Sequence, residues 1–496
     1  MRLVALVVAL ALIALRIVAA AGLAPFGDEA FYWQCAQHPD VHYADHPFMT
    51  AMLVRAGTAL VGDGRLGIRI AFLACGALLP FAVAWLARTF VGPRDAFWAG
   101  LLVLIVPGLA AAGTLATPDA PYLLLVALGL VGFERALASD ARRWWLAAGL
   151  ITALGLATHY RFVLFPFAAL LVLVLSARGR RAWRRGGPWI AGLVGLLGLL
   201  PAAIHNVRLD FAPLRYQLGA RHASPEGAEN LRKYFSEQAG AAVTPLLYVA
   251  LLLALAVAIR RARRGDEPSG VAAVFAAVWL GLFLLASPWS DGANASAHWP
   301  LAGYLPLLPL VPGLLRAAWA AGGVRAAFAA LAPASALLAV TLLYVDMTTQ
   351  AVGFGMRGAF LGWDELAEHT EALLPDEPLP LIVADNYMTG AALDLRLGDH
   401  ADVYVLDHPK NVAHGRGGQY VLWGRDEAAL RREHAGRPAL FVLETSSLTS
   451  AERPGVVGRQ RALFERLRWR AEVVGAVDPD GDIERHFVIY TSRALR

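Results

Sequence analysis

Long apolar runs separated by short polar loops dominate the first two thirds of the chain. The first run, residues 3–23, is long enough to cross a bilayer. Its length argues against a cleaved signal peptide, whose apolar core is shorter. Windows of roughly 19 residues predict about eleven spans in all. They lie near 3–23, 67–87, 96–114, 119–137, 144–158, 161–176, 188–205, 241–259, 271–287, 299–315 and 326–345. We therefore expect a polytopic α-helical membrane protein.

The pattern changes beyond residue 348, where hydropathy falls and the apolar runs become short. Runs of four apolar residues bounded by turn residues are typical of buried strands, and alternation is typical of half-buried ones. The expected elements are a helix at 363–374 and strands at 381–384, 403–406, 440–443 and 486–490. The sequence thus predicts a membrane domain over 1–348 and a small soluble α/β domain over 349–496.

Composition and charge agree with this division and suggest a topology. The chain of 496 residues is 57% hydrophobic and carries a net charge of +5. Its arginines gather in alternate loops, which marks those loops as cytoplasmic. The clusters lie at 88–94, 135–143, 178–185, 260–264 and 316–325. Asp28, Asp119 and the chain after residue 345 are then expected on the outer side, in a periplasm or its equivalent.

The loop after the first span carries acidic and aromatic residues side by side. It contains GDEAFYW at 27–33 and DHP at 45–47, followed by an amphipathic helix at 48–61 expected to lie along the membrane surface. A fixed, partly desolvated carboxylate at Asp28 or Glu29 could act as a general base. The alternative is structural, because acids favour the first turn of a helix and aromatic residues form interfacial belts.

Two further short loops carry candidate groups on the same expected side. One is TPDAP at 117–121, which places Asp119 at the start of a span, and the other is THYR at 158–161. In the second loop, His159 and Arg161 could bind an anion, or Tyr160 and Arg161 could simply anchor the chain at the interface.

The long outer loop at 206–240 is rich in cations, which runs against the topology rule and suggests an anionic partner. Arg215 and Arg221 are the strongest candidates, because Phe211, Tyr216 and Gln217 interleave with them. A guanidinium matches phosphate oxygens with two parallel donors. The alternative is a solvated loop that meets lipid headgroups. The segment His298-Trp299-Pro300, at the mouth of a later span, could line a lipid cavity.

The order of these motifs, together with GDGRLGIR at 62–69, resembles the GT-C membrane glycosyltransferases. Within that group the chain is similar to the family 39-like branch of protein O-mannosyltransferases, the lipid A aminoarabinose transferase and related bacterial enzymes. The resemblance covers residues 1–345. The tail from residue 350 also resembles the soluble domain that many bacterial members carry.

The resemblance implies residue roles. Asp28 corresponds to the presumed catalytic base, and Asp119 to a second acid that supports the acceptor pocket. Asp45 and His46 correspond to an acid–base pair, with His46 at a position where the aminoarabinose branch has a phosphate-binding Lys. His159 also replaces a Lys, so that Arg161 could supply the cation instead. His298 falls in a segment that relatives have as Asn-Trp-Pro.

The resemblance implies an inverting transfer of a sugar from a polyprenyl phosphate to a lipid, glycan or protein acceptor. The enzyme would be a multi-pass protein of the bacterial inner membrane with a periplasmic tail, and we expect no nucleic acid partner. A divalent metal stays open, with Asp45 and His222 as one suitable pair. The alternatives are a flippase of lipid-linked sugars, a polysaccharide ligase or polymerase, and a non-catalytic scaffold with an exported binding domain. A flippase would need charges deep within the spans.

Overall fold

The computed structural model describes residues 2–209, 211, 214–215, 227–289, 297–349, 357–376, 379–477 and 483–496. Contacts divide the chain into two compact units, which are described separately. The first unit comprises Met1–Ala20, His46–Thr50 and Arg69–Val345. The second comprises Ala21–Asp45, Ala51–Ile68 and Asp346–Arg496, so that the first polar loop groups with the C-terminal tail. The predicted boundary near residue 348 stays a prediction.

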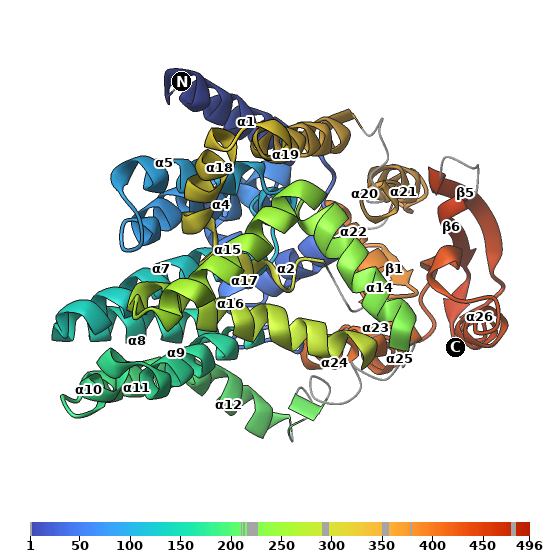
Figure 1. The fold of residues 1–496 in the computed structure, drawn as a ribbon. Helices are drawn as coiled ribbons and strands as arrows, with labels where there is room; N and C mark the ends of the chain where they lie inside the picture. The colour runs from blue at the N-terminus through green and yellow to red at the C-terminus, as the bar shows by residue number, and fades with distance from the viewer. Residues whose placement is uncertain are drawn as a thin grey trace. The chain divides into compact units, whose positions relative to one another are not determined.

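Apolar helices build the first unit (Figure 1). Within the described residues, eight helical stretches are long and apolar enough to cross a membrane, or nine if the bent pair Tyr160–Leu175 and Ala177–Trp183 counts as one span. The helices are α1 (Arg2–Gly22), α4 (Arg65–Ala87), α5 (Pro93–Leu102), α6 (Pro107–Ala112), α7 (Asp119–Ser139), α8 (Arg142–Leu156), α9 (Leu164–Leu175), α10 (Ala177–Trp183), α11 (Gly187–Leu196), α12 (Leu200–Arg208), α14 (Gly227–Glu237), α15 (Pro245–Arg263), α16 (Glu267–Ala286), α17 (Leu301–Tyr304), α18 (Val311–Ala320) and α19 (Gly323–Thr349).

The predicted count of about eleven spans is not confirmed. The run at 96–114 is divided between α5 and α6, with a break before Pro107. Proline lacks the N–H that would continue a helix, which accounts for the break. Helix α8 has 15 residues. At 1.5 Å per residue it spans only about 22 Å, less than the roughly 30 Å of a hydrocarbon core.

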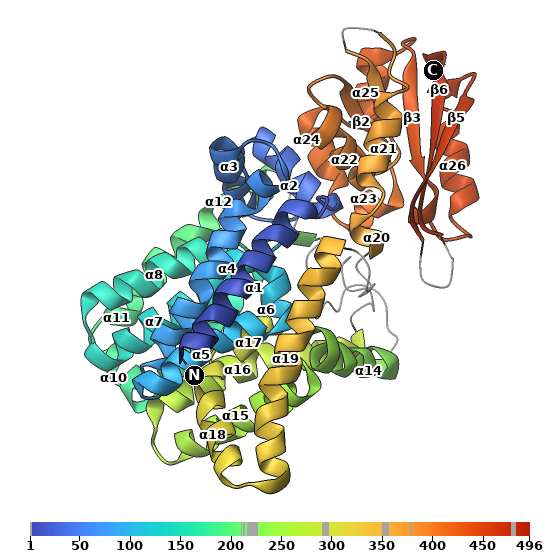
Figure 2. The ribbon, with the colours of Figure 1, turned by 90° about the horizontal axis from the view of Figure 1, so that it is seen from above.

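Helices from the two ends of the first unit lie side by side (Figures 1 and 2). Arg16 of α1 is only 4% exposed, and its Nε donates a hydrogen bond of 3.1 Å to the hydroxyl of Tyr344 in α19. A charged group in a span is costly unless it finds polar partners within the protein. The Tyr344 hydroxyl gives the buried guanidinium one polar partner, whereas its Nη1 has no hydrogen-bond partner among the described residues.

The second unit contains a five-stranded mixed sheet with the strand order β2-β1-β3-β6-β5. Strands β1 (Leu381–Ala384), β2 (Asp402–Val405) and β3 (Ala439–Glu444) are parallel, whereas β6 (Ile483–Ser492) runs antiparallel to both β3 and β5 (Arg468–Val477). A short antiparallel pair, β4 (Phe464–Glu465) and β7 (Ala494–Leu495), forms a separate two-stranded sheet. The predicted strands are confirmed. The sequence prediction missed β5, where charged residues and register shifts obscure the alternation.

Helices cover both faces of this sheet (Figure 2). Apolar residues of α21 (Trp363–Glu371) and α22 (Tyr387–Leu397) pack on one face, and those of α25 (Glu427–His434) pack on the other. The remaining helices of the unit are α2 (Gly27–Gln37), α20 (Arg357–Phe360), α23 (Pro409–Ala413), α24 (Gly417–Trp423) and α26 (Arg453–Arg461), with most of α3 (Met49–Val61). The helix predicted at 48–61 is confirmed as α3, and its position along the membrane surface stays a prediction.

Candidate functional site

The two adjacent carboxylates of the first polar loop have different surroundings. Both lie in the first turn of α2, as the structural alternative anticipated. Glu29 is fully buried, and its Oε2 accepts a hydrogen bond of 3.3 Å from the backbone N–H of Phe26, which caps the helix. The side chain of Asp28 is 31% exposed. Asp28 is thus the member of the pair that a substrate can reach.

A buried arginine joins Asp28 to Asp45. Nη1 of Arg416 lies 2.7 Å from Oδ1 of Asp28, and its Nη2 lies 2.9 Å from Oδ2 of Asp45. Its Nε donates a further bond of 3.0 Å to the same Asp45 oxygen. The side chain of Arg416 is 4% exposed, so this is a desolvated, charge-assisted pairing with two carboxylates.

Aromatic rings enclose the Arg416 guanidinium. Its carbon lies 4.4 Å from the ring centroid of Phe31, 4.5 Å from that of Tyr387 and 5.6 Å from that of Tyr32. A desolvated guanidinium gains energy over such ring faces. The Tyr387 hydroxyl also donates a bond of 3.2 Å to Oδ1 of Asp28. Among the described residues, both polar contacts of Asp28 therefore fall on one oxygen, and Oδ2 remains available.

The charges around Asp28 favour its ionised form. Burial raises the pKa of this carboxyl, and Asp45 adds a small further increase. Arg416, and then His414, outweigh these effects, so the pKa of Asp28 lies below its ordinary value. Burial and Arg416 lower the pKa of His414 to about 4, so this ring is neutral near pH 7.

Local backbone geometry brings Arg416 to Asp28. Gly415, in the connection between α23 and α24, has a φ of +70°, a backbone conformation that residues with a Cβ rarely adopt. Gly27 lets α2 approach α22, since a Cβ there would lie 2.5 Å from Cγ of Met388. From α24, the Tyr420 hydroxyl donates a bond of 2.6 Å to Gln34 of α2.

The first unit holds a second cluster, built around Asp119 and Arg161. Nη2 of Arg161 lies 2.7 Å from Oδ1 of Asp119, and Nε2 of His298 lies 3.7 Å from the other oxygen. The guanidinium lies over the rings of Tyr122 and Trp299, at 5.3 and 5.7 Å. Nη1 of Arg161 is buried and has no hydrogen-bond partner among the described residues. An unpaired buried donor is costly, and an anionic ligand would satisfy it.

His159 and His46 lie beside this arginine. Nδ1 of His159 accepts a bond of 3.0 Å from the backbone N–H of Arg161, and its ring centroid lies 5.0 Å from that of His46. A ring nitrogen that accepts a hydrogen bond carries no proton. In this arrangement Arg161, not His159, supplies the cation.

The structure thus groups the sequence candidates into two sets. Asp28 and Asp45 lie in the second unit, and Asp119, His46, His159, Arg161 and His298 lie in the first. Arg215 is exposed, whereas Arg221, Tyr216, Gln217 and His222 lie outside the described residues. No group of three or more His, Cys, Asp or Glu side chains in the described part of the chain is arranged to hold a metal ion.

Sequence reasoning missed Arg416, Tyr387 and His414. The one local signal was HGRGG at 414–418, a basic run with the glycines that a tight turn needs.

Comparisons with known proteins agree with the motifs. Residues 45–205 match a family model described as dolichyl-phosphate-mannose-protein mannosyltransferase. The chain is 28% identical over 371 residues to lipid A galacturonosyltransferase RgtD of Rhizobium johnstonii, covering 73% of this chain and 75% of that protein. It is 29% identical over 261 residues to an undecaprenyl phosphate-alpha-4-amino-4-deoxy-L-arabinose arabinosyl transferase of Pseudomonas aeruginosa, covering 50% of this chain and 46% of that one.

Solved structures establish the fold. ArnT from Cupriavidus metallidurans bound to undecaprenyl phosphate superposes with a TM-score of 0.68 at 18% identity, covering 100% of this chain and 99% of that one. The archaeal oligosaccharyltransferase AglB from Archaeoglobus fulgidus gives 0.52 at 13% identity, covering 97% and 74%. The chain is a GT-C fold membrane glycosyltransferase.

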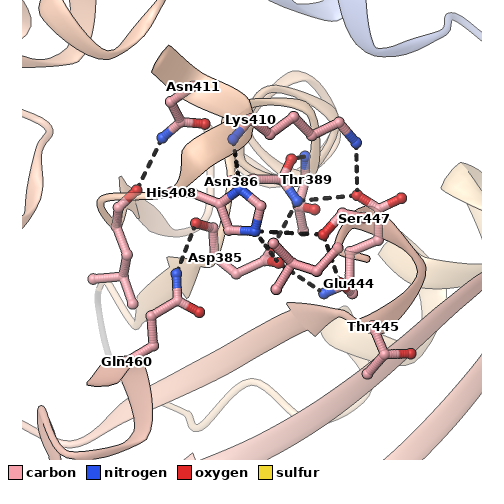
Figure 3. Close-up of polar contacts among 12 residues, drawn as sticks. Asp385, Asn386, Thr389, His408, Lys410, Asn411, Glu444, Thr445, Ser447 and Gln460 are labelled. Carbon is pink, nitrogen blue, oxygen red and sulfur yellow. Dashed lines mark hydrogen bonds and ion pairs between the residues drawn. The ribbon is translucent and has the colours of Figure 1, made fainter. Parts of the chain in front are cut away.

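This glycosyltransferase has a further polar cluster at the carboxyl ends of β1 and β3 (Figure 3). Asn386 donates bonds of 3.0 Å to both Asp385 and Glu444, and Nζ of Lys410 lies 3.1 Å from Glu444. Asp385, Asn386 and Glu444 are buried. The bonds join the ends of neighbouring strands, so the cluster stabilises the sheet.

The cluster includes His408 and Ser447 but is not a hydrolase triad (Figure 3). Nδ1 of His408 accepts a bond of 3.0 Å from the backbone N–H of Lys410, so a neutral ring carries its proton on Nε2. That same nitrogen faces both Ser447, at 3.5 Å, and Asp385, at 4.0 Å. A protonated nitrogen cannot accept the serine proton.

Asp385 and His408 should make opposite contributions to stability between pH 4 and 7. Burial, and then Glu444, raise the pKa of Asp385 to about 7. The folded state then binds more protons than the unfolded one, and stability falls as pH rises. Burial, and then Lys410, lower the pKa of His408 to about 4. Here the unfolded state binds more protons, and stability rises with pH.

In Asp385→Asn the contribution of His408 remains, so we expect the free energy of unfolding to increase from pH 4.5 to 6.5. In His408→Asn the contribution of Asp385 remains, so we expect the free energy of unfolding to decrease over the same range. Each slope should reach up to about 1.4 kcal/mol per pH unit. Asparagine keeps the acceptor that caps α23. Native-state hydrogen exchange of the β1 and β3 amides in the full-length protein measures the opening free energy. Slopes of the same sign in both variants would contradict the opposite pKa shifts of the two groups.

Proposed function

We propose that this enzyme transfers a sugar from undecaprenyl phosphate to lipid A or a similar lipid at the outer face of the bacterial inner membrane. The names of RgtD and of the arabinosyl transferases support a lipid-linked donor and a lipid A acceptor. The alternate arginine clusters support an outer location for Asp28, Asp119 and the tail. Galacturonic acid and aminoarabinose are the first donor sugars to test.

Asp28 is the general base of the proposed reaction. The observation that carries this role is a partly exposed carboxylate that Arg416 holds ionised, with an Oδ2 that accepts no hydrogen bond from the described residues. The acceptor hydroxyl gives its proton to Asp28 and attacks the anomeric carbon opposite the phosphate. The new glycosidic bond forms as the bond from the anomeric carbon to the phosphate oxygen breaks, which inverts the anomeric configuration in one step. Undecaprenyl phosphate leaves.

Arg161 is the proposed cation for the leaving phosphate. Its Nη1, which has no hydrogen-bond partner among the described residues, offers a donor, and the neighbouring rings of His46 and His298 add polar surface. Asp119 holds the guanidinium through Nη2 and so sets the direction of Nη1. We accordingly assign Asp119 to positioning Arg161. Charge developing on the leaving oxygen gains most from a donor fixed before the reaction.

Asp28→Asn should lower the transfer rate by about 10²–10⁴-fold, because the variant lacks a proton acceptor. The assay follows release of free undecaprenyl phosphate from the two lipid-linked sugars when lipid A is present. Asp63→Asn is the matched control, because Asp63 accepts an exposed bond from Trp33 and does not contact Arg416. Full activity of Asp28→Asn would remove Asp28 from the base role.

Arg161→Gln should weaken binding of undecaprenyl phosphate by about 10- to 100-fold, the loss expected for one charge-assisted hydrogen bond. Equilibrium binding of the lipid to the purified protein measures the effect. Arg316→Gln is the control, since Arg316 of the same unit also pairs with an aspartate, Asp95, and is half exposed. Equal affinities in the two variants would rule out Arg161 as the phosphate ligand.

A further inference from the structure

We propose that Arg416 is a positioning residue for sugar transfer: its guanidinium orients the Asp28 carboxylate and keeps it ionised. The tail of the second unit would then serve catalysis directly and not only support the fold. The inference rests on the proposed function, since it takes Asp28 as the base. Arg416 lies outside the stretch 45–205 that the family model matches.

The geometry of the Arg416 guanidinium suits it to orient the Asp28 carboxylate. Its two arms reach different carboxylates, with Nη1 on Asp28 at 2.7 Å and Nη2 on Asp45 at 2.9 Å. The rings of Phe31 and Tyr387 lie within 4.5 Å of its carbon, which restricts its rotation. A planar fork held in this way defines the direction of Asp28, whereas a lysine ammonium would act only as a point charge.

The contacts leave one Asp28 oxygen for chemistry. Arg416 and Tyr387 both donate to Oδ1, so the carboxylate is fixed on one side. Oδ2 receives no bond from the described residues, and the side chain is 31% exposed. A general base must offer its lone pair at a defined place, and this arrangement provides one.

The charges facing Asp28 come from three segments. Arg416 and His414 lie before α24, Tyr387 lies in α22, and Asp45 and Tyr32 lie in the first polar loop. His414 is neutral near pH 7 because its pKa is about 4. Arg416 is then the only fixed cation among these groups. Without it, burial and Asp45 would both favour protonated Asp28, which cannot act as a base.

The test is the pH dependence of kcat for Arg416→Gln, divided by that of the unaltered enzyme at each pH from 4.5 to 8.5. The ratio cancels titrations that the two proteins share. We expect it to fall toward low pH, because the acid limb of the variant should move upward by about 1–3 pH units. Arg416→Lys should move the acid limb most of the way back to its position in the unaltered enzyme, because lysine restores the positive charge. Its kcat should remain low, because lysine lacks the planar guanidinium that orients Asp28.

Two variants control for simple disruption. Arg396→Gln removes a guanidinium of the same unit that bonds Asp364 at 2.8 Å, away from Asp28, and its ratio should be flat with pH. Asp45→Asn breaks the other arm of the Arg416 pairing. Its ratio should not fall toward low pH, because removing this negative charge lowers the pKa of Asp28 further.

A flat ratio for Arg416→Gln, with inactive Asp28→Asn, would overturn the inference and leave the proposed function intact. Fully active Asp28→Asn would overturn both, because no base would then need positioning. If Arg416→Gln fails to fold, Arg416→Lys decides the question. Its unchanged kcat would show that the fork has no positioning role.

Discussion

The second unit depends on one desolvated guanidinium shared between two carboxylates. Arg416 bonds Asp28 and Asp45 among aromatic rings, and each carboxylate lies more than 370 residues before it in the chain. A buried charge without a partner would be strongly destabilising, whereas this one has an opposite charge on each arm. The two carboxylates of the first polar loop and Arg416 of the C-terminal tail therefore stabilise one another in their charged, buried state.

The same arrangement separates the roles of neighbouring acids. Glu29 caps α2 and is enclosed, whereas Asp28 is half-buried and faces a cation. In the first unit, Asp119 pairs with Arg161 and leaves one guanidinium nitrogen without a described partner. Each unit thus contains an acid paired with an arginine. In the proposed reaction, one pair would prepare a carboxylate to accept a proton, and the other would prepare a guanidinium to bind a phosphate.

Sequence patterns predicted the features that depend on local order. The long apolar helices, the strands β1, β2, β3 and β6, and the acidic motifs around Asp28 and Asp119 all follow from runs or spacings of a few residues. The span count is not confirmed where a proline divides a run and where α8 is short. Arg416 could not be predicted, because its partners lie far away along the chain and no repeat links them. His159, which the resemblance places at a Lys position, accepts a hydrogen bond from the Arg161 backbone, a contact that no local pattern predicts.

A double-mutant cycle on Asp28 and Arg416 tests most directly whether the guanidinium holds the carboxylate. The opening free energy of α2 would be measured by native-state hydrogen exchange in the full-length protein, in Asp28→Asn, in Arg416→Gln and in the double variant. Groups in direct contact show coupling of about 0.5–3 kcal/mol. We predict coupling in that range, with the double variant less destabilised than the sum of the single ones. Additive effects would show that Arg416 does not hold Asp28.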